Sequence, residues 1–381
     1  MTESRGRATV AVVRCESYDR GDVERAVGRA VELVGGIERF VSGGEQILLK
    51  PNLLSAKAPE RAITTHPEVA RAVVGLVRRA GGEPRLGDSP GGAIRGVERV
   101  WRNTGFLDLS EETGVPLVSF EASGSEERVG RLQSYMVARP VIEADGVINL
   151  PKMKTHVLTL YTGAVKNMYG IVPGFMKGRL HSVAPRPVPF SRVVVDVFSL
   201  APPRLSVMDA VVAMEGDGPS GGSPRKVGAI LASEDAVALD AVAARMMGYR
   251  ERQVPTVRIG EERGLGVAGL DLIDIVGDDS DALTPGDFRL PGTGALNYIP
   301  DGLVRLLTPF IWAHPEMSRE RGCRGPECGL CVRSCPVQAI RMADGIPKVD
   351  FTTCVECLCC HEVCPHDAVE VKLSWLARKF A

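Results

Sequence analysis

The chain has 381 residues, of which 44% are hydrophobic and 24% are charged, and its 46 Lys and Arg nearly balance its 47 Asp and Glu. This length predicts two or three globular domains, and a net charge near zero excludes the overall positive field typical of nucleic-acid-binding proteins. No apolar run approaches the roughly 18 residues that span a bilayer, and the first residues lack a signal-peptide pattern, so we expect a cytoplasmic protein without a membrane span.

Short β-branched runs alternate with amphipathic stretches of helical length through the first 280 residues. The patterns predict strands at 8–15, 45–50, 83–87, 115–120, 146–150, 205–208, 226–231 and 272–276, and helices at 22–34, 65–80, 235–247 and 254–263. Asp235 is expected to cap the third of these helices. Alternation of this kind predicts an α/β fold with a mostly parallel sheet that helices cover on both faces.

Polar loops follow two of the predicted strands. Lys-Pro-Asn follows the second strand, and Gly-Asp-Ser-Pro-Gly-Gly follows the third. Ligands bind beyond the carboxyl ends of parallel strands, and glycine lets backbone amides approach an anion. The alternative is a plain Gly-Pro turn in each loop. The candidate ligand-binding residues here are Lys50, Asn52, Asp88 and Ser89.

The segment 151–192 is strongly basic: it contains seven Lys or Arg and two His, and neither Asp nor Glu. Three interpretations are an anion-binding pocket, a docking face for an acidic protein, and nucleic-acid contact, but the last lacks the interleaved aromatic residues that stack on bases. We expect lysines to hold a carboxylate or phosphate, and a histidine to supply a proton. The candidate catalytic residues are Lys152, Lys154, His156, Lys166 and His181, with Asn167 as a further substrate contact.

Two aspartates follow later in the main domain. Asp209 ends a predicted strand, and Asp217 lies in a glycine-rich loop in which Gly216, Gly218 and Gly221 spell G-x-G-x-x-G. The loop contains prolines and leads into a strand, so it lacks the helix that a dinucleotide site requires. We expect both carboxylates at the mouth of the sheet, where they orient a substrate or pair with lysines.

Nine of the ten cysteines fall between Cys323 and Cys364. The second half of this stretch has the spacing C-x2-C-x2-C-x3-C-P of bacterial iron-sulfur proteins, and the first half repeats it with two extra residues in the first gap. Zinc binding and a disulfide framework are the alternatives. Because the fourth cysteine of such a run ligates the other cluster, we assign Cys323, Cys328, Cys331 and Cys364 to one [4Fe-4S] cluster, and Cys354, Cys357, Cys360 and Cys335 to a second.

The halves also match beyond their cysteines, since Cys-Pro-Val-Gln-Ala-Ile at 335–340 resembles Cys-Pro-His-Asp-Ala-Val at 364–369. This internal repeat predicts a duplicated, ferredoxin-like α+β domain. Cys359 lies between two expected ligands and is predicted to be a bystander. The expected divisions are a main domain at 1–283, a linker and docking segment at 284–317, and the ferredoxin-like domain at 318–381.

Two apolar segments flank that domain. We expect Leu303–Trp312 to be a docking helix, with a membrane-surface anchor as the alternative, and Trp375–Phe380 to dock in the same way.

Several motifs occur in a fixed order: Lys-Pro-Asn, Gly-Asp-Ser-Pro-Gly-Gly, Lys-x-Lys-Thr-His, Gly-Ala-Val-Lys-Asn, Met-Asp and Gly-Asp-Gly-Pro, ahead of two cysteine runs. In this order they resemble the domain of unknown function 362 family over about residues 8 to 280. The resemblance implies a site built from these loops, and an iron-sulfur tail in the members that carry one. It implies no particular substrate.

The combined features predict an oxidoreductase, more specifically a reductase. An external low-potential donor, such as a ferredoxin or reductase protein, would charge the clusters, and an anionic small molecule would be reduced at the basic pocket. One alternative is an electron carrier or adaptor that docks a redox protein through its basic face. Another is a metal-dependent site made by His156, His181, Asp209 and Asp217. Lysines that converge in a concavity facing a cluster indicate the enzyme, and lysines on a convex surface indicate the carrier.

Overall fold

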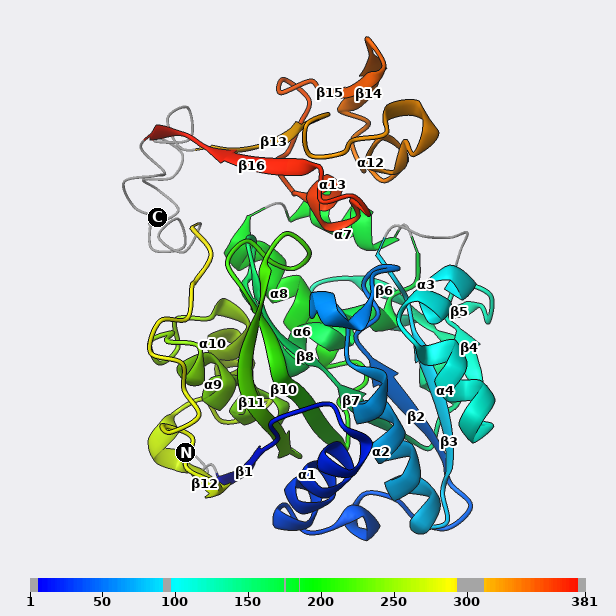
Figure 1. Cartoon of the computed structure of the whole chain (residues 1–381), viewed down its shortest axis with the longest axis vertical. Coiled ribbons are helices and arrows are strands. Elements are labelled where there is room, and N and C mark those ends of the chain that lie inside the picture. The colour runs from blue at the N-terminus through cyan, green and yellow to red at the C-terminus, as the bar shows by residue number, and fades with distance from the viewer. Residues whose placement is uncertain (1–5, 92–96, 175, 185, 293–311, 376–381) are drawn as a thin grey trace.

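The computed structural model describes residues 6–91, 97–174, 176–184, 186–292 and 312–375. An α/β main domain comes first, and a smaller cysteine-rich unit, residues 312–375, sits on one end of it (Figure 1). Among the described residues, no helix is both long enough and apolar enough to cross a membrane.

One ten-stranded sheet forms the centre of the main domain, in the order β12-β1-β11-β10-β7-β2-β3-β4, with β8 beside β10 and β9 beside β8. Six of the strand pairs are parallel, and β1–β11, β10–β11 and β8–β9 are antiparallel. The α/β prediction is confirmed. The strands of this sheet are β1 (Ala8–Arg14), β2 (Gln46–Pro51), β3 (Glu83–Asp88), β4 (Leu117–Ser119), β7 (Gly146–Leu150), β8 (Lys152–His156), β9 (Leu160–Thr162), β10 (Leu205–Glu215), β11 (Ser223–Ser233) and β12 (Ile273–Gly277).

Helices cover both faces of the sheet. Successive strand residues point to opposite sides, so each face presents its own apolar side chains for helices to cover. In β1, Val10 and Val12 join one buried core, whereas Ala11 and Val13 join the other. The second core contains side chains of α1 (Arg20–Leu33), α2 (Pro67–Arg79), α3 (Val97–Asn103) and α4 (Phe106–Thr113). The first core contains side chains of α5 (Arg139–Glu143), α6 (Ala164–Asn167), α7 (Met176–Val183), α8 (Pro187–Phe198), α9 (Ala236–Met246) and α10 (Pro255–Glu262).

The helix α9 begins where its sequence predicts. The carboxylate of Asp235 accepts hydrogen bonds from the backbone N–H groups of Val237 and Ala238, both at 2.9 Å, so it satisfies two donors that the helix leaves free. A separate hairpin of β5 (Ser125–Val129) and β6 (Ser134–Ala138) lies outside the main sheet.

The cysteine-rich unit consists of two antiparallel strand pairs and two short helices. β13 (Ala313–Met317) pairs with β16 (Val369–Leu373), β14 (Ile340–Ala343) pairs with β15 (Ile346–Val349), and the helices are α12 (Leu330–Arg333) and α13 (Cys359–Glu362). Residues 313–317 were predicted to lie in the linker, but as β13 they supply the hydrogen-bonding partner of β16. Most of the apolar segments 303–312 and 375–380 lies outside the described residues.

The backbone of the unit repeats itself. Gly329 and Leu358 have positive φ angles of 53° and 57° directly before α12 and α13, and Gln338 and Asp367 have 55° and 53° after the following Cys-Pro. In both halves the backbone N–H four residues beyond that cysteine donates to its sulfur, at 3.2 Å for Cys335 and 3.3 Å for Cys364. The two halves therefore share one local geometry, as the sequence repeat suggests.

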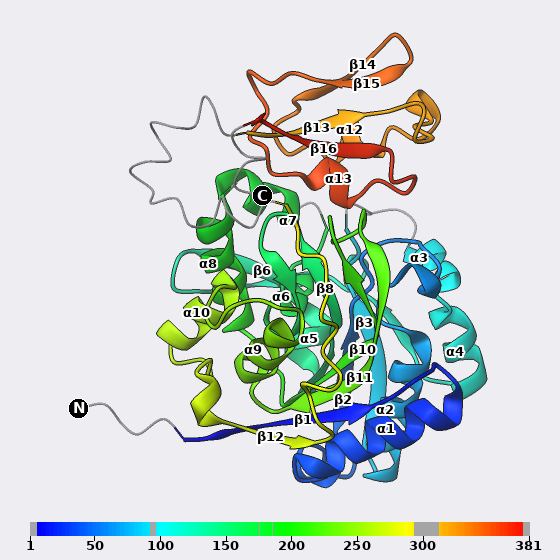
Figure 2. The same cartoon turned by 60° about the vertical axis from the view of Figure 1, so that its left-hand side comes forward.

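In both views α13 lies on the side of the unit that faces the main domain, next to α7 (Figure 1, Figure 2). A Cβ added to Gly178 in α7 would lie 3.8 Å from Pro336, which confirms that the two units touch there. Side chains of α13 line the same cavity as Asn52 and Asp88, so the helix lies near the carboxyl ends of β2 and β3.

Candidate functional site

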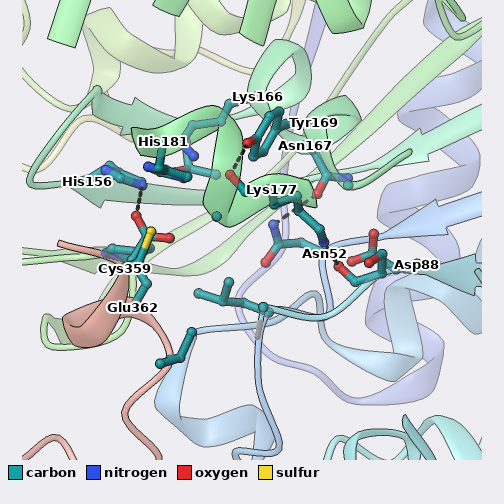
Figure 3. A pocket seen from close by; sticks show the side chains of 18 of the residues that line it. Asn52, Asp88, His156, Lys166, Asn167, Tyr169, Lys177, His181, Cys359 and Glu362 are labelled. Atoms are coloured by element: carbon teal, nitrogen blue, oxygen red, sulfur yellow. Dashed lines mark hydrogen bonds and ion pairs between the residues drawn. The ribbon is translucent and has the colours of Figure 1, made fainter. Parts of the chain in front are cut away.

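A cavity of about 100 Å³ lies between the main domain and the cysteine-rich unit. It is placed at the carboxyl ends of β2 and β3, where ligands of parallel sheets bind, and Figure 3 shows side chains converging on it from both units. We call it the interdomain pocket. Its polar and aromatic lining residues are Asn52, Asp88, Ser89, Lys154, His156, Thr162, Lys166, Asn167, Tyr169, Lys177, His181, Ser334, Cys359 and Glu362.

Lys154 is held at the wall of this pocket by two hydrogen bonds. Its ammonium donates to Asn52 Oδ1 at 2.8 Å and to the Ile63 carbonyl at 2.7 Å, and the residue is 1% exposed. Burial and the nearby positive charge of Lys166 together lower the pKa of Lys154 to about 7. An ammonium has three donors, so one remains for a ligand.

Lys166 and Lys177 bring two more ammonium groups. Lys166 is half-buried and makes no ion pair with any described residue, and its nitrogen lies 5.7 Å from the ring centroid of Tyr169 and 5.4 Å from that of Phe190. Lys177 donates to the carbonyl of Ser89, and burial lowers its pKa to about 8. Burial also lowers the pKa of Lys166. The pocket thus contains three lysines that form no ion pair with a carboxylate among the described residues.

The two histidines of the pocket are neutral. Burial lowers the pKa of His156 to about 3 and that of His181 to about 4. His156 Nδ1 accepts the backbone N–H groups of Leu158 and Thr159, at 3.0 and 3.3 Å, so its proton resides on Nε2. An imidazole with so low a pKa is a poor acid source near pH 7.

The cysteine-rich unit contributes Glu362 and Cys359 of α13 to the pocket. Glu362 Oε1 lies 3.1 Å from His156 Nε2, although neither atom has an aligned hydrogen bond with a described residue. Figure 3 shows both side chains of α13 beside the histidines. Cys359 also lines a second cavity within its own unit, so it separates the two spaces.

A chain of amides supports Lys154. Asn52 donates to Asn167 Oδ1 at 2.9 Å, and Asn167 donates to Asn149 Oδ1 at 2.8 Å and to the Lys50 carbonyl. All three asparagines are buried. Because each amide fixes the orientation of the next, the acceptor of the Lys154 ammonium is held in place.

The short helix that carries Lys166 is positioned by Asp240 of α9. The buried Asp240 carboxylate accepts the backbone N–H groups of Ala164 and Val165, at 2.6 and 2.9 Å, and the hydroxyl of Tyr161. A Cβ at Gly163 would lie 2.1 Å from this carboxylate, so only glycine fits the turn before Lys166.

Two of the predicted site residues, Lys152 and Asp209, belong to a different buried network, in which Asp209 takes one of its two expected roles and pairs with a lysine. Lys152 is 1% exposed and pairs with Asp209 at 2.8 Å, and Tyr18 bonds to both of them at 2.8 Å. Neither Lys152 nor Asp209 lines the interdomain pocket. The carboxylate of Asp209 instead neutralises the nearest lysine, which is energetically required for a charge buried in this way.

Two further residues also differ from expectation. Lys50 is fully buried and pairs with Asp88 at 2.7 Å, so it lies behind Asp88 and outside the pocket lining. Asp217 is exposed and does not line the pocket. A metal site of His156, His181, Asp209 and Asp217 is not assembled, and no three His, Cys, Asp or Glu within the described ranges are grouped to hold one metal ion.

The cysteines surround two cavities in the cysteine-rich unit. Cys323, Cys328, Cys331 and Cys364 line one, and Cys335, Cys354, Cys357 and Cys360 line the other, together with Cys359. A cubane has four irons at separate corners, each with its own thiolate, so ligands around a cavity suit it better than ligands that meet at one point. The grouping of cysteines and the N–H···S bonds to Cys335 and Cys364 therefore fit two cubanes.

Ion pairs and a hydrogen bond hold the units together. Asp367 lies 3.0 Å from Lys57 and 2.9 Å from Arg61, both in the loop after β2. Ser220 donates to the carbonyl of Glu362 at 2.9 Å. The same loop contains Ile63, whose carbonyl accepts from Lys154, so unit docking and pocket geometry are linked.

Sequence patterns did not single out several residues that line or support the pocket. Lys177 belonged to the basic segment but was not selected, and Tyr169 followed the selected Lys-Asn pair. Glu362 and Cys359 had no local signal, because only the docking of α13 brings them to the pocket.

Three comparisons relate the chain to known proteins. The model of a family described as Domain of unknown function (DUF362) matches residues 47–245. Thylakoid-associated protein sll1697 of Synechocystis sp. is 36% identical over 295 residues, which are 74% of this chain and 91% of that protein. A ferredoxin of Methanothermococcus thermolithotrophicus is 39% identical over 51 residues, which are 13% of this chain and 85% of that protein.

Among solved structures, the lactate racemase apoprotein from Thermoanaerobacterium thermosaccharolyticum matches with a TM-score of 0.44 and 12% identity. The match covers 65% of this chain and 58% of that chain. A likeness this distant has no bearing on activity.

Proposed function

Because this chain belongs to the family described as Domain of unknown function (DUF362) and contains a segment similar to ferredoxins, we propose that it is an iron-sulfur oxidoreductase. In this proposal it works as a reductase. It takes electrons from an external low-potential protein donor and reduces a small anionic substrate in the interdomain pocket. We place this reaction in the cytoplasm.

One observation carries the proposal: the pocket and the second cysteine cavity share a wall. Lys154 and Lys166 line the pocket from the main domain, whereas Cys359 lines both the pocket and the cavity of Cys335, Cys354, Cys357 and Cys360. A bound substrate would therefore lie directly beside the place expected to hold a cluster. This arrangement suits electron delivery to the pocket.

Two [4Fe-4S] clusters, held by the two sets of four cysteines, would supply electrons one at a time. The residues of the pocket provide binding, charge and protons. Lys166 and Lys177 bind the anionic group, and their charge stabilises the additional negative charge that reduction places on the substrate.

Lys154 is the proton donor in this proposal, in place of the histidines. An effective acid has a pKa near the working pH, and the pKa of Lys154 is about 7, whereas those of His156 and His181 are about 3 and about 4. Lys154 is fixed through two of its protons and keeps the third for the substrate. A two-electron reduction consumes two protons, and exchange with water restores Lys154 between transfers.

The electron carrier or adaptor is the second candidate. It requires basic side chains on a surface that a protein partner can reach. Lys154 is 1% exposed, and Lys166 and Lys177 are half-buried in a concavity that α13 covers. This burial favours a small ligand over a protein partner at these lysines.

We expect the anaerobically reconstituted protein to contain about eight irons per chain and to give the EPR signal of coupled [4Fe-4S] centres after reduction. When the reduced protein is mixed with a panel of small carboxylates and phosphates, at least one compound should reoxidise it, because the pocket lies next to the second cysteine cavity. The recovery of the visible absorbance that reduction bleaches, followed in a stopped-flow instrument, measures the rate of reoxidation.

The control is the variant Lys348→Ala, which removes an exposed lysine of the cysteine-rich unit outside the pocket. It should react like the unchanged protein. Full iron content without reoxidation by any member of the panel would support the carrier, and tight zinc without iron would exclude both candidates.

Anion binding should weaken as the pH rises above about 7. Below this pH Lys154 is already charged in the free protein, because its pKa is about 7. Above it, a bound anion stabilises the ammonium, so binding requires proton uptake and the association constant falls by up to about tenfold per pH unit. Lys177, with a pKa of about 8, adds a second proton at higher pH.

Isothermal titration calorimetry between pH 6 and 9 in buffers of different ionisation enthalpy measures this proton uptake. His156 and His181 stay neutral across the range and contribute nothing. The variant Lys154→Met should flatten the profile near pH 7. An affinity that does not change between pH 6 and 9 would mean that neither lysine binds the anion.

A further inference from the structure

The interdomain pocket combines lysines with a carboxylate that has no hydrogen-bond donor aligned to it. Glu362 reaches the pocket from α13, its side chain is 12% exposed, and its Oε1 lies 3.1 Å from His156 Nε2 but has no aligned hydrogen bond among the described residues. A buried polar atom without a partner is costly, and more so when it is charged. The site therefore provides an acceptor that a ligand with a donor group would satisfy.

Other polar atoms of the pocket are also without partners. His181 Nδ1 and Thr162 Oγ1 have no hydrogen bond to any described residue, although the two residues are only 3% and 4% exposed. Ser334 Oγ, from the cysteine-rich unit, is in the same state. All three residues line the pocket. Buried polar atoms normally have partners, so their convergence on one cavity indicates a polar ligand.

The size of the pocket limits this ligand. One water needs roughly 10–15 Å³ of such space, so a cavity of about 100 Å³ has room for a molecule of under about ten non-hydrogen atoms. A carboxylic acid of three to five carbons fits this volume.

We infer that the pocket takes a small carboxylic acid that also carries a hydroxyl or ammonium group, and that Glu362 selects for this donor. The inference rests on the proposed anion site, in which Lys166 and Lys177 bind the carboxylate of the ligand. The donor group then bonds to Glu362, which reaches the pocket from the cysteine-rich unit (Figure 3). An acid without a donor gives Glu362 no aligned hydrogen bond.

A matched set of ligands tests this inference on the reconstituted full chain, by calorimetry and without turnover. The three probes are 2-methylbutyrate, 2-hydroxybutyrate and 2-aminobutyrate, which differ only in a methyl, hydroxyl or ammonium substituent of similar size. A hydrogen bond to a charged group predicts that the hydroxy and amino acids bind about tenfold tighter than the methyl acid, or more.

The variant Glu362→Gln should reduce this preference to less than about threefold, because the amide is neutral and accepts more weakly. The matched control is Glu370→Gln in β16, which removes an equal charge from the same unit; Glu370 lies 3.7 Å from Arg321 and does not line the pocket. It should keep the full preference. Iron content is measured for each variant, to confirm that the unit has remained folded.

Several results would overturn the inference. Equal binding of all three acids to the unchanged protein would leave the anion pocket in place but remove the selection, and this result does not depend on any variant folding. Tighter binding of all three acids to Glu362→Gln would mean that Glu362 only repels anions. If none of the acids binds, the anion pocket itself is wrong, and the reoxidation experiment decides the proposed function separately.

Discussion

The variant Lys166→Met is expected to bind the anionic substrate about a hundredfold more weakly than the unchanged protein, while it unfolds at the same temperature or a higher one. The loss follows because a charge-assisted hydrogen bond contributes about 1.5–3 kcal/mol, and removal of a charge that acts on the transition state adds to this. Stability is retained because Lys166 has no ion-pair partner among the described residues, and burial already disfavours its charge.

Substrate reoxidation of the reduced protein, calorimetry and a thermal melt together measure these two effects. The iron content must equal that of the unchanged protein for the comparison to hold. Suppose that the substrate reoxidised the reduced Lys166→Met variant at an unchanged rate and bound to it with unchanged affinity. Lys166 would then have no place in the site. A large loss of thermal stability would instead indicate a structural role for this lysine.

The variant Lys152→Met is expected to have the opposite profile, with a large loss of stability. It leaves the Asp209 carboxylate buried without its counter-ion, and breaking such a pair costs about 3–5 kcal/mol. For a domain of this size the thermal midpoint should fall by roughly 6–10 °C. The remaining folded protein should keep its affinity for the anion, because Lys152 does not line the pocket.

Differential scanning fluorimetry measures the midpoint, and the double variant Lys152→Met with Asp209→Asn is the control. Removing the carboxylate as well should recover part of the loss, because the asparagine is neutral and its amide oxygen can still accept the hydrogen bond from the backbone N–H of His66. A single variant as stable as the unchanged protein would show that the pair contributes nothing. A double variant no more stable than the single one would assign the loss to packing.

The comparison of Lys152 with Lys154 shows what the sequence could and could not predict. Alternation along β8 puts both side chains on one side of the strand, and the absence of acids in the segment made them look alike. Their partners lie on other elements: Lys152 faces Asp209 of β10, whereas Lys154 faces Asn52 after β2. Only the register between distant strands separates the structural lysine from the pocket lysine.

The fold was largely predictable because its signals are local. The strand β1 and the capped helix α9 follow directly from side-chain periodicity and from Asp235. The short β8 and α6 were missed because neither is long enough for a clear period. Glu362 was not predictable as a pocket residue, since its placement depends on ion pairs between Asp367 and the loop after β2.

The helix α13 carries Cys360 of one proposed set, is followed two residues later by Cys364 of the other, and closes the interdomain pocket. Metal binding and local folding are usually coupled in small metal-holding units. A protein without its iron would therefore lose the α13 wall of the pocket as well as its supply of electrons. If oxidation destroyed the proposed clusters, the protein would then release the bound acid and would not retain it in an inactive complex.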